Sequence, residues 1–267
     1  MLDWLQITRR HLNTRYVGRE MEGHAVLGST NVRALAWALD GTPAGSVVVA
    51  DQQTAGKGRL GRDWQGGQGL SLLFSVVARP KVEDERFGLI PLVAGLAVVD
   101  AVQPVVGQSA VQLKWPNDIL VEGRKSAGIL VESVMVMGGV PKSRCAVIGI
   151  GVNVNQEVMP QGLEATAISL RQATGAIIPR PILLAHLLEA LEERLDQLED
   201  DAEGVIRAYS NRLAGVNQPV SLSRPDGGQV HGTSLGIDGS GALCILTANG
   251  ERSVFTAGEV TQSPRNP

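Results

Sequence analysis

Apolar side chains recur at helical spacing in several segments of the chain. The most regular pattern lies in residues 181–200, where leucines fall on one face and predict a long amphipathic helix. These leucines are Leu183, Leu184, Leu187, Leu188, Leu191, Leu195 and Leu198. Similar spacing predicts helices at 2–12, around 88–103 and at 202–213, and a helix within 28–40. Ser29 or Thr30 would cap this last helix.

Short apolar runs rich in β-branched residues predict strands. The predicted strands are 45–50, 70–78, 111–123, 124–138 and 143–155. The third is interrupted at Pro116 and then resumes, and the last two are expected to pair. From about residue 215 the turn dipeptides Asp-Gly, Gly-Ser and Asn-Gly separate short strands, which indicates a small antiparallel β-domain. We therefore predict an α+β chain with two domains, residues 1–213 and 214–267.

Composition narrows the class of protein. Hydrophobic residues make up 43% of the 267 residues, and the net charge of −3 argues against a general nucleic-acid binder. The two cysteines, Cys145 and Cys244, form no C-x-x-C pair and predict reduced thiols in a cytoplasmic protein. The N-terminus does not resemble a secretory signal, and we find no apolar run of the ~18 residues that a membrane span needs. We therefore expect no membrane partner.

The most informative stretch is AGKGRLGRDW at 55–64, in which three glycines have the spacing G-x-G-x-x-G. A dinucleotide-binding turn opens a helix, but more glycines and then a strand follow here, so that interpretation fails. No Gly-Lys-Ser/Thr closes the loop, which also excludes a Walker A motif. Glycines that allow close backbone approach, together with Lys57, Arg59 and Arg62, favour a loop that orders around a polyanion. A solvated hairpin tip is the alternative.

A second group of polar residues lies around the interrupted strand. Lys114, Asn117, Asp118 and Lys125 are close in the sequence LKWPNDILVEGRKSAG, and Asn153 lies at the end of a later strand. Each also has a plain structural explanation, because aspartate and asparagine are common in turns and lysine is common on solvated faces. None of these residues singly indicates a function.

Together these motifs resemble the biotin protein ligases. The resemblance lies in GSTN (28–31), DQQTAGKGRLGRDW (51–64), KWPNDIL (114–120), GRKSAGILVE (123–132), GIGVNVN (149–155), AISL (167–170) and AGEV (257–260). It implies a mixed-sheet, class II synthetase-like catalytic domain followed by a small Src-homology-3-like β-barrel. It also implies an enzyme that uses ATP to convert biotin into biotinyl-5'-adenylate, releasing pyrophosphate, and then passes biotin to a lysine of a carrier domain.

The resemblance also implies functional residues, position by position. For biotin they are Ser29, Thr30, Asn31, Gln53, Gly56, Lys57, Lys125 and Gly128. For ATP and the adenylate they are Arg59, Arg62, Trp64, Asn117, Lys125 and Asn153. Lys125 and Arg59 are the implied catalytic residues. Asp118 is our candidate to orient or deprotonate the acceptor lysine, and it matches a position near Mg²⁺ and the phosphates. Lys57 departs from the family pattern, which has mostly arginine there, and an ammonium cannot form a bidentate contact.

The expected partner is the biotin carboxyl carrier protein domain of acetyl-CoA carboxylase or a related carboxylase, and the expected assembly is a monomer or a homodimer. Only about 27 residues precede Gly28, fewer than a DNA-binding winged helix needs, so we expect no operator binding. The alternatives are a lipoate or octanoate ligase of the same architecture, a non-enzymatic anion-binding module, and the oxidoreductase suggested by the glycine spacing. The KWPND and R-K-x-x-G motifs, with the C-terminal β-domain, favour biotin.

Overall fold

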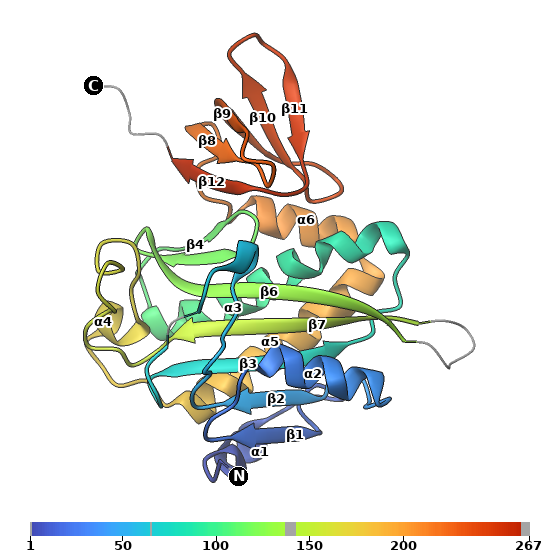
Figure 1. Cartoon of the computed structure of the whole chain (residues 1–267), viewed down its shortest axis with the longest axis vertical. Coiled ribbons are helices and arrows are strands. Elements are labelled where there is room, and N and C mark those ends of the chain that lie inside the picture. The colour runs from blue at the N-terminus through green and yellow to red at the C-terminus, as the bar shows by residue number, and fades with distance from the viewer. Residues whose placement is uncertain (1, 65, 137–142, 263–267) are drawn as a thin grey trace.

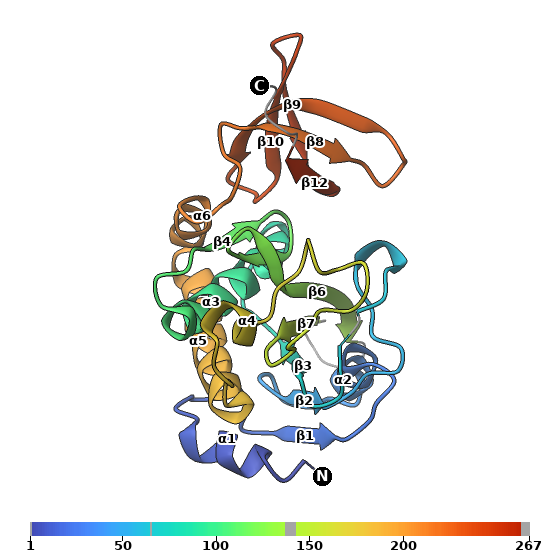
Figure 2. The same ribbon diagram turned by 90° about the vertical axis from the view of Figure 1, so that its left-hand side faces the viewer.

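The computed structural model describes residues 2–64, 66–136 and 143–262, which form two units (Figures 1 and 2). The larger unit is built on a seven-stranded sheet in the order β1-β2-β3-β7-β6-β5-β4. Its strands are β1 (Met21–His24), β2 (Val47–Ala50), β3 (Ser71–Ala78), β4 (Val111–Lys114), β5 (Asp118–Val121), β6 (Arg124–Val136) and β7 (Ser143–Asn153). β1 and β2 are parallel and the other neighbours are antiparallel. This mixed sheet confirms the predicted α+β class.

Helices cover both faces of the sheet, with α3 and α5 on one side and α2 on the other (Figure 2). The helices are α1 (Leu5–His11), α2 (Thr30–Leu39), α3 (Ile90–Val106), α4 (Leu170–Thr174), α5 (Arg180–Asp200) and α6 (Ala202–Ser210), with 3-10 turns η1 (Arg59–Gly61) and η2 (Asp84–Leu89). Every leucine predicted to lie on the apolar face of α5 is buried, which confirms that helix. Each buried leucine contributes about 1.5–3 kcal/mol through the hydrophobic effect, so α5 and α3 together form much of the core.

The sequence analysis found no apolar run of membrane-spanning length, whereas the segment Asp84–Val106, which combines η2 and α3, reaches that length. It is long and apolar enough to cross a membrane by length and composition alone. In the structure, however, 72% of its most apolar window is buried within the protein. α3 packs against α5, α6 and the central strands, so its composition is that of a core helix.

The chain reverses at Pro116, and the prediction of one interrupted strand was wrong. β4 and β5 are antiparallel neighbours, and Lys114 pairs with Asp118 across the turn. The three residues between them contain a cis Trp115–Pro116 peptide bond. The sequence prediction also missed β1, because its four residues MEGH carry no β-branched run. Only the parallel pairing with β2 makes that segment a strand.

The smaller unit is a five-stranded antiparallel sheet that curls into a barrel-like C-terminal domain (Figure 1). Its order is β11-β10-β9-β8-β12, with β8 (Pro219–Ser223), β9 (Gln229–Ile237), β10 (Leu243–Thr247), β11 (Arg252–Phe255) and β12 (Glu259–Gln262). The backbone of Leu113 in β4 bonds to Arg212 and Ala214 of the connecting segment at 2.8 Å each. Trp115 Nε1 donates to the Gly241 carbonyl at 3.0 Å. These bonds fasten the domain beside the β4–β5 turn.

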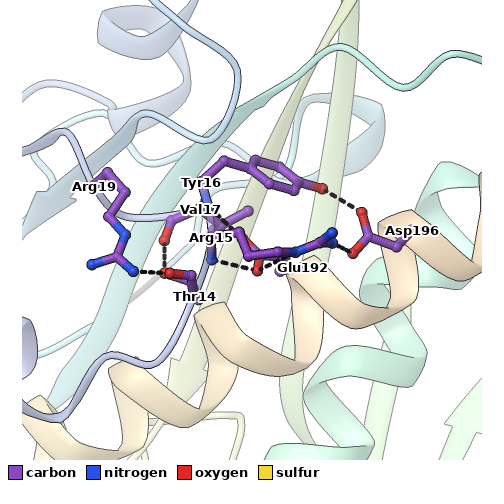
Figure 3. A network of polar contacts seen from close by, with 7 residues as sticks. All are labelled: Thr14, Arg15, Tyr16, Val17, Arg19, Glu192 and Asp196. Carbon is purple, nitrogen blue, oxygen red and sulfur yellow. Dashed lines mark hydrogen bonds and ion pairs between the residues drawn. The ribbon is translucent and has the colours of Figure 1, made fainter.

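The segment before β1 is held to α5 by one buried carboxylate (Figure 3). Glu192 accepts hydrogen bonds from the backbone N–H groups of Arg15, Tyr16 and Val17 at 2.7, 2.8 and 2.9 Å. Burial alone would raise the pKa of Glu192, but these three bonds and the Arg15 guanidinium more than offset it, so the net pKa lies below its ordinary value. Tyr16 and Arg15 both donate to Asp196 one turn later.

Candidate functional site

One cavity of about 690 Å³ gathers the predicted site residues. It is bounded by β5, β6 and β7, by the glycine-rich loop 55–64, and by the C-terminal domain. All the residues predicted to bind biotin or ATP line it, with the exception of Gly56. Gly56 lies behind the wall, where a Cβ would come within 3.1 Å of Gln53 Nε2 and of the Trp64 carbonyl oxygen. A direct contact between Gly56 and a ligand remains a prediction.

The floor of the cavity is made by glycines of β6 and β7. A Cβ on Gly151 would lie 2.5 Å from Trp64, and one on Gly128 would lie 2.8 Å from the same indole. Real Cβ atoms do not approach so closely, so these positions let the Trp64 ring lie against the sheet backbone. The resemblance placed Trp64 near adenine and Gly128 near biotin, whereas here the two residues touch. Stacking of adenine on Trp64 therefore remains a prediction.

The start of α2 forms one end of the cavity. Ser29 occupies the N-cap position, as predicted, but its side chain makes no capping hydrogen bond. The Thr30 N–H and hydroxyl both donate to Gln53 Oε1, at 2.6 and 3.0 Å. Asn31 is fastened more tightly, since its amide donates to the Leu130 carbonyl at 3.2 Å and its Oδ1 accepts from Ser75 at 2.6 Å. This network fixes the shape of the cavity end with little freedom for rearrangement.

Lys125 reaches the cavity because β6 contains a bulge. Ala127 pairs with Ile119 and Lys125 pairs with Leu120, so Ser126 is an extra residue in β6. In a regular strand, residues three apart point to opposite faces, but the bulge turns Lys125 toward the face of Gly128. A Cβ on Gly128 would indeed lie 3.2 Å from Lys125 Cε.

Two further contacts hold the Lys125 ammonium and backbone. Its Nζ lies 2.6 Å from Asp118 Oδ1 and 5.5 Å from the centre of the Trp64 ring, which adds a cation–π contact. Its backbone N–H donates to Thr166 at 2.8 Å, and its carbonyl accepts from Ile168 at 2.9 Å. The AISL motif (167–170) thus supports the segment that carries the lysine.

The glycine-rich loop forms a small hairpin over the cavity, between β2 and β3 rather than before a helix. Gly58 donates to the Arg62 carbonyl at 2.6 Å, and Leu60 and Gly61 form the tip with φ of 56° and 73°. Both tip residues are left-handed, which glycine tolerates freely and leucine does not. The hairpin therefore holds Arg59 and Arg62 on either side of its tip. Because the glycines lie between two strands and do not open a helix, the structure gives the oxidoreductase interpretation no support.

Arg59 points inward from this hairpin. Its Nη1 donates to Asn117 Oδ1 at 3.3 Å and to the Gly258 carbonyl at 3.4 Å. Burial lowers the pKa of the Arg59 guanidinium, Asp118 raises it, and the like charge of Arg62 lowers it further, with a net shift below its ordinary value. An anion in the cavity would relieve both the burial cost and this repulsion.

Two amide side chains, Asn117 and Asn153, also line the cavity. Asn117 Nδ2 donates to the Ile129 carbonyl at 2.8 Å, which leaves its Oδ1 facing Arg59. Asn153 is buried at the end of β7, and its Oδ1 accepts from Gln156 at 3.3 Å. Both amides are therefore oriented before any ligand is bound.

Much of the cavity wall was not predicted from the sequence. The additional lining residues lie on β4, on the segment before α4, and on the C-terminal domain, and include Gln112, Met159, Leu163, Ser234, Leu243, Glu259 and Thr261. The motifs AISL and AGEV marked two of these regions, but the sequence assigned no role to them. The structure shows that both domains enclose the cavity.

Comparison with known proteins identifies the family. The model of the biotin/lipoate A/B protein ligase family matches residues 24–153, and the biotin protein ligase C-terminal domain matches residues 215–261. The biotin--[acetyl-CoA-carboxylase] ligase of Mycobacterium tuberculosis is 34% identical over 263 residues, which is 95% of each chain. The chain belongs to the biotin protein ligase family. This agrees with the resemblance drawn from the motifs.

Other members of the biotin protein ligase family match across both domains. The bifunctional ligase/repressor BirA of Bacillus subtilis is 34% identical over 249 residues, which cover 92% of this chain and 75% of that protein. The biotin protein ligase of Aquifex aeolicus, solved in complex with biotin and ATP, has a TM-score of 0.78 and 27% identity, covering 92% of this chain and 100% of the other. The family fold therefore extends from the mixed sheet to the C-terminal sheet.

Proposed function

We propose that this chain is an ATP-dependent biotin protein ligase. It activates biotin as biotinyl-5'-adenylate with release of pyrophosphate and transfers biotin to a lysine of a carrier domain. The observation that carries the proposal is the shared cavity, in which the Lys125–Asp118 pair lies between the glycine floor and the arginine hairpin. Family members from Mycobacterium tuberculosis and Paracoccus denitrificans are named biotin--[acetyl-CoA-carboxylase] ligases.

The first step brings together two anions, the biotin carboxylate and ATP. Their repulsion grows as water is excluded from the cavity. Lys125, Arg59 and Arg62 all line the cavity and would offset this repulsion and stabilise charge on the transferring α-phosphate. The carboxylate oxygen attacks the α-phosphorus, the bond to the bridging oxygen breaks, and pyrophosphate leaves. The step requires no nucleophile from the protein.

The second step needs a neutral acceptor lysine, whereas a free lysine has a pKa near 10.4. Asp118 is the carboxylate beside Lys125 in the cavity, at 2.6 Å from its ammonium. We propose that Asp118 orients the acceptor amine and takes up its proton. The amine then attacks the acyl carbon of the mixed anhydride, an amide forms, and AMP leaves.

The same residues suit a Mg²⁺ ion that arrives with ATP. Within the described ranges, no group of three or more His, Cys, Asp and Glu could hold a metal unaided. Asp118 would supply the carboxylate in the usual arrangement, in which Mg²⁺ keeps waters and is bound by one or two carboxylates and the substrate phosphates. When bound, the ion would act as a Lewis acid that polarises the phosphate oxygens and stabilises their negative charge.

The acceptor would be the biotin carboxyl carrier protein domain of acetyl-CoA carboxylase or a related carboxylase. Cytoplasmic location, a monomeric or homodimeric state, and the lack of operator binding remain predictions. The domain boundary between residues 213 and 214 also remains a prediction. A lipoate or octanoate ligase is not favoured, because the C-terminal match is to the biotin ligase domain.

The test is ATP–pyrophosphate exchange measured with biotin, with lipoate, with octanoate and with no acid. We expect exchange only with biotin, because the same cavity must bind the acid and ATP together. Biotin should then be transferred to a carrier domain but not to a variant in which its acceptor lysine is arginine. Exchange with lipoate or octanoate instead of biotin, or no exchange at all, would overturn the proposal.

A further inference from the structure

The beginning of β12 touches the arginine hairpin. Figure 2 shows β12 at the side of the C-terminal domain that faces the catalytic domain. Arg62 Nη1 lies 2.8 Å from Glu259 Oε1, and Arg59 Nη1 donates to the Gly258 carbonyl at 3.4 Å. Two successive residues of the AGEV motif therefore contact the two arginines that flank the hairpin tip.

Glycine is required at the first of these two positions. Gly258 has φ of 148°, and a Cβ there would lie 2.6 Å from Leu222 and 3.0 Å from the Ser223 carbonyl oxygen. This close approach to β8 fixes the direction of the Gly258 carbonyl toward the cavity. It also fixes where the next side chain, Glu259, leaves the strand.

The charge of Glu259 matters because the two arginines repel each other. Without a negative group nearby, Arg59 and Arg62 would favour an open hairpin when no anion is bound. Both Arg62 and Glu259 are partly exposed, at 57% and 38% of their side-chain areas, so water screens the pair. An ion pair of this kind is weak enough to open repeatedly and strong enough to bias the hairpin toward the closed form.

We propose that Glu259 is a positioning residue that latches the glycine-rich hairpin closed over the cavity through Arg62. This inference rests on the proposed function, because a closed hairpin would retain biotinyl-adenylate until the acceptor lysine arrives. The C-terminal domain thereby controls how long the intermediate stays bound. Between the hairpin and its surroundings the arginines make one screened ion pair and two long hydrogen bonds, from Arg59 to Asn117 at 3.3 Å and to Gly258 at 3.4 Å, so the hairpin can still open for the acceptor.

The first test follows the hairpin directly and needs no catalysis. Trypsin cleaves after lysine and arginine and needs an extended, mobile segment, so opening of the hairpin should speed cleavage after Lys57, Arg59 and Arg62, and Glu259→Gln leaves all three cleavage sites in place. We expect Glu259→Gln to speed cleavage in this hairpin about two- to fivefold, the ratio that an exposed ion pair corresponds to. The matched control is Glu251→Gln, because Glu251 lies on the same domain and its side chain accepts from Asn249 rather than from the hairpin. Equal cleavage rates for Glu259→Gln and wild type would overturn the latch.

The second test measures loss of the intermediate. With biotin and ATP present, labelling of a bystander protein per pyrophosphate released should rise about two- to fivefold in Glu259→Gln. Arg62→Gln should also raise cleavage at Lys57 and Arg59, and adding Glu259→Gln to it should have a smaller effect than Glu259→Gln has in the wild-type background, where the remaining part comes from the attraction of Glu259 for Arg59. Additive effects of the two changes would show that they do not act through one ion pair. If wild type shows no biotin-dependent pyrophosphate release, the proposed function fails, whereas the cleavage result still decides the latch.

Discussion

Lys125 owes its position to its neighbours rather than to its place in a regular strand. The bulge at Ser126 turns it toward the cavity, Asp118 pairs with its ammonium, and the segment 166–168 bonds its backbone. A flexible lysine loses about 2 kcal/mol of rotamer entropy when it is ordered. Most of that cost is met here before a ligand binds, so the charge is already in place for the phosphate that Lys125 is proposed to stabilise.

Replacing Lys125 by alanine should therefore reduce biotin-dependent pyrophosphate release about 100- to 1,000-fold, the usual effect of losing one preorganised electrostatic contact. The measurement is single-turnover pyrophosphate release with saturating biotin and ATP. Arg124→Ala is the matched control, since Arg124 precedes Lys125 and pairs with Glu122 at the surface, 3.6 Å away. A Lys125→Ala rate within twofold of wild type would contradict the assigned role.

At the scale of elements, α5 serves as the anchor for two parts of the chain. One face packs against α3 and α1, and Glu192 binds the segment before β1 through three backbone N–H groups. Because those N–H groups belong to consecutive residues, one carboxylate fixes a turn that has no regular secondary structure. This anchor places β1 at the edge of the sheet beside β2.

Glu192→Gln should lower the free energy of unfolding at pH 7 by about 1–3 kcal/mol, because a buried charged acceptor is lost. The lowered pKa of Glu192 also predicts a pH dependence. Its contribution is complete above the ordinary glutamate pKa of about 4.3 and is lost as the pH falls from there through the lowered folded-state value. Urea denaturation across this range should therefore show a shallower acid dependence in the variant.

Glu189→Gln is the control for that experiment. Glu189 lies on the same helix and accepts the Asn13 N–H at 2.7 Å, one backbone bond in place of three among the described residues. We expect it to change stability by less than about 1 kcal/mol. Equal losses of stability in the two variants would show that the three hydrogen bonds to Glu192 stabilise the fold no more than the single bond to Glu189.

At the scale of the whole molecule, the β4–β5 turn joins the domains and the site. Trp115 is buried and bonds to Gly241 of the C-terminal domain, while Asn117, two residues later, accepts from Arg59 of the hairpin. A movement of the C-terminal domain at Gly241 would therefore be passed through Trp115 to Asn117, which lines the cavity. The KWPND motif thus has a structural role besides the chemical role proposed for it.

Trp115→Phe should destabilise the protein by about 1–3 kcal/mol, because the buried Gly241 carbonyl loses its donor. Chemical denaturation followed by circular dichroism would measure the change. Trp37→Phe is the control, since Trp37 is half-buried on α2 and contacts Arg33 by a cation–π interaction instead. If Trp115→Phe were as stable as wild type, the Trp115–Gly241 bond would not contribute to domain attachment.

Local patterns allowed much of the fold and site to be predicted. The leucine spacing of α5 and the β-branched run of β2 can be seen within a short stretch of sequence, and the structure confirms the helix and the strand that they predict. β1 could not be predicted, because its pairing with β2 rather than its own residues makes it a strand. The reversal at Pro116 was missed because an interrupted strand and a tight hairpin share the same local pattern.

The sequence by itself determined the chemistry of the hairpin, because glycine freedom and arginine charge are properties of the residues themselves. Only the tertiary structure decided what those residues meet. Trp64 lies against Gly151, and Arg62 pairs with Glu259, which lies 197 positions away in the chain. Such contacts depend on how the sheet, the hairpin and the C-terminal domain pack together, and no local pattern encodes that packing.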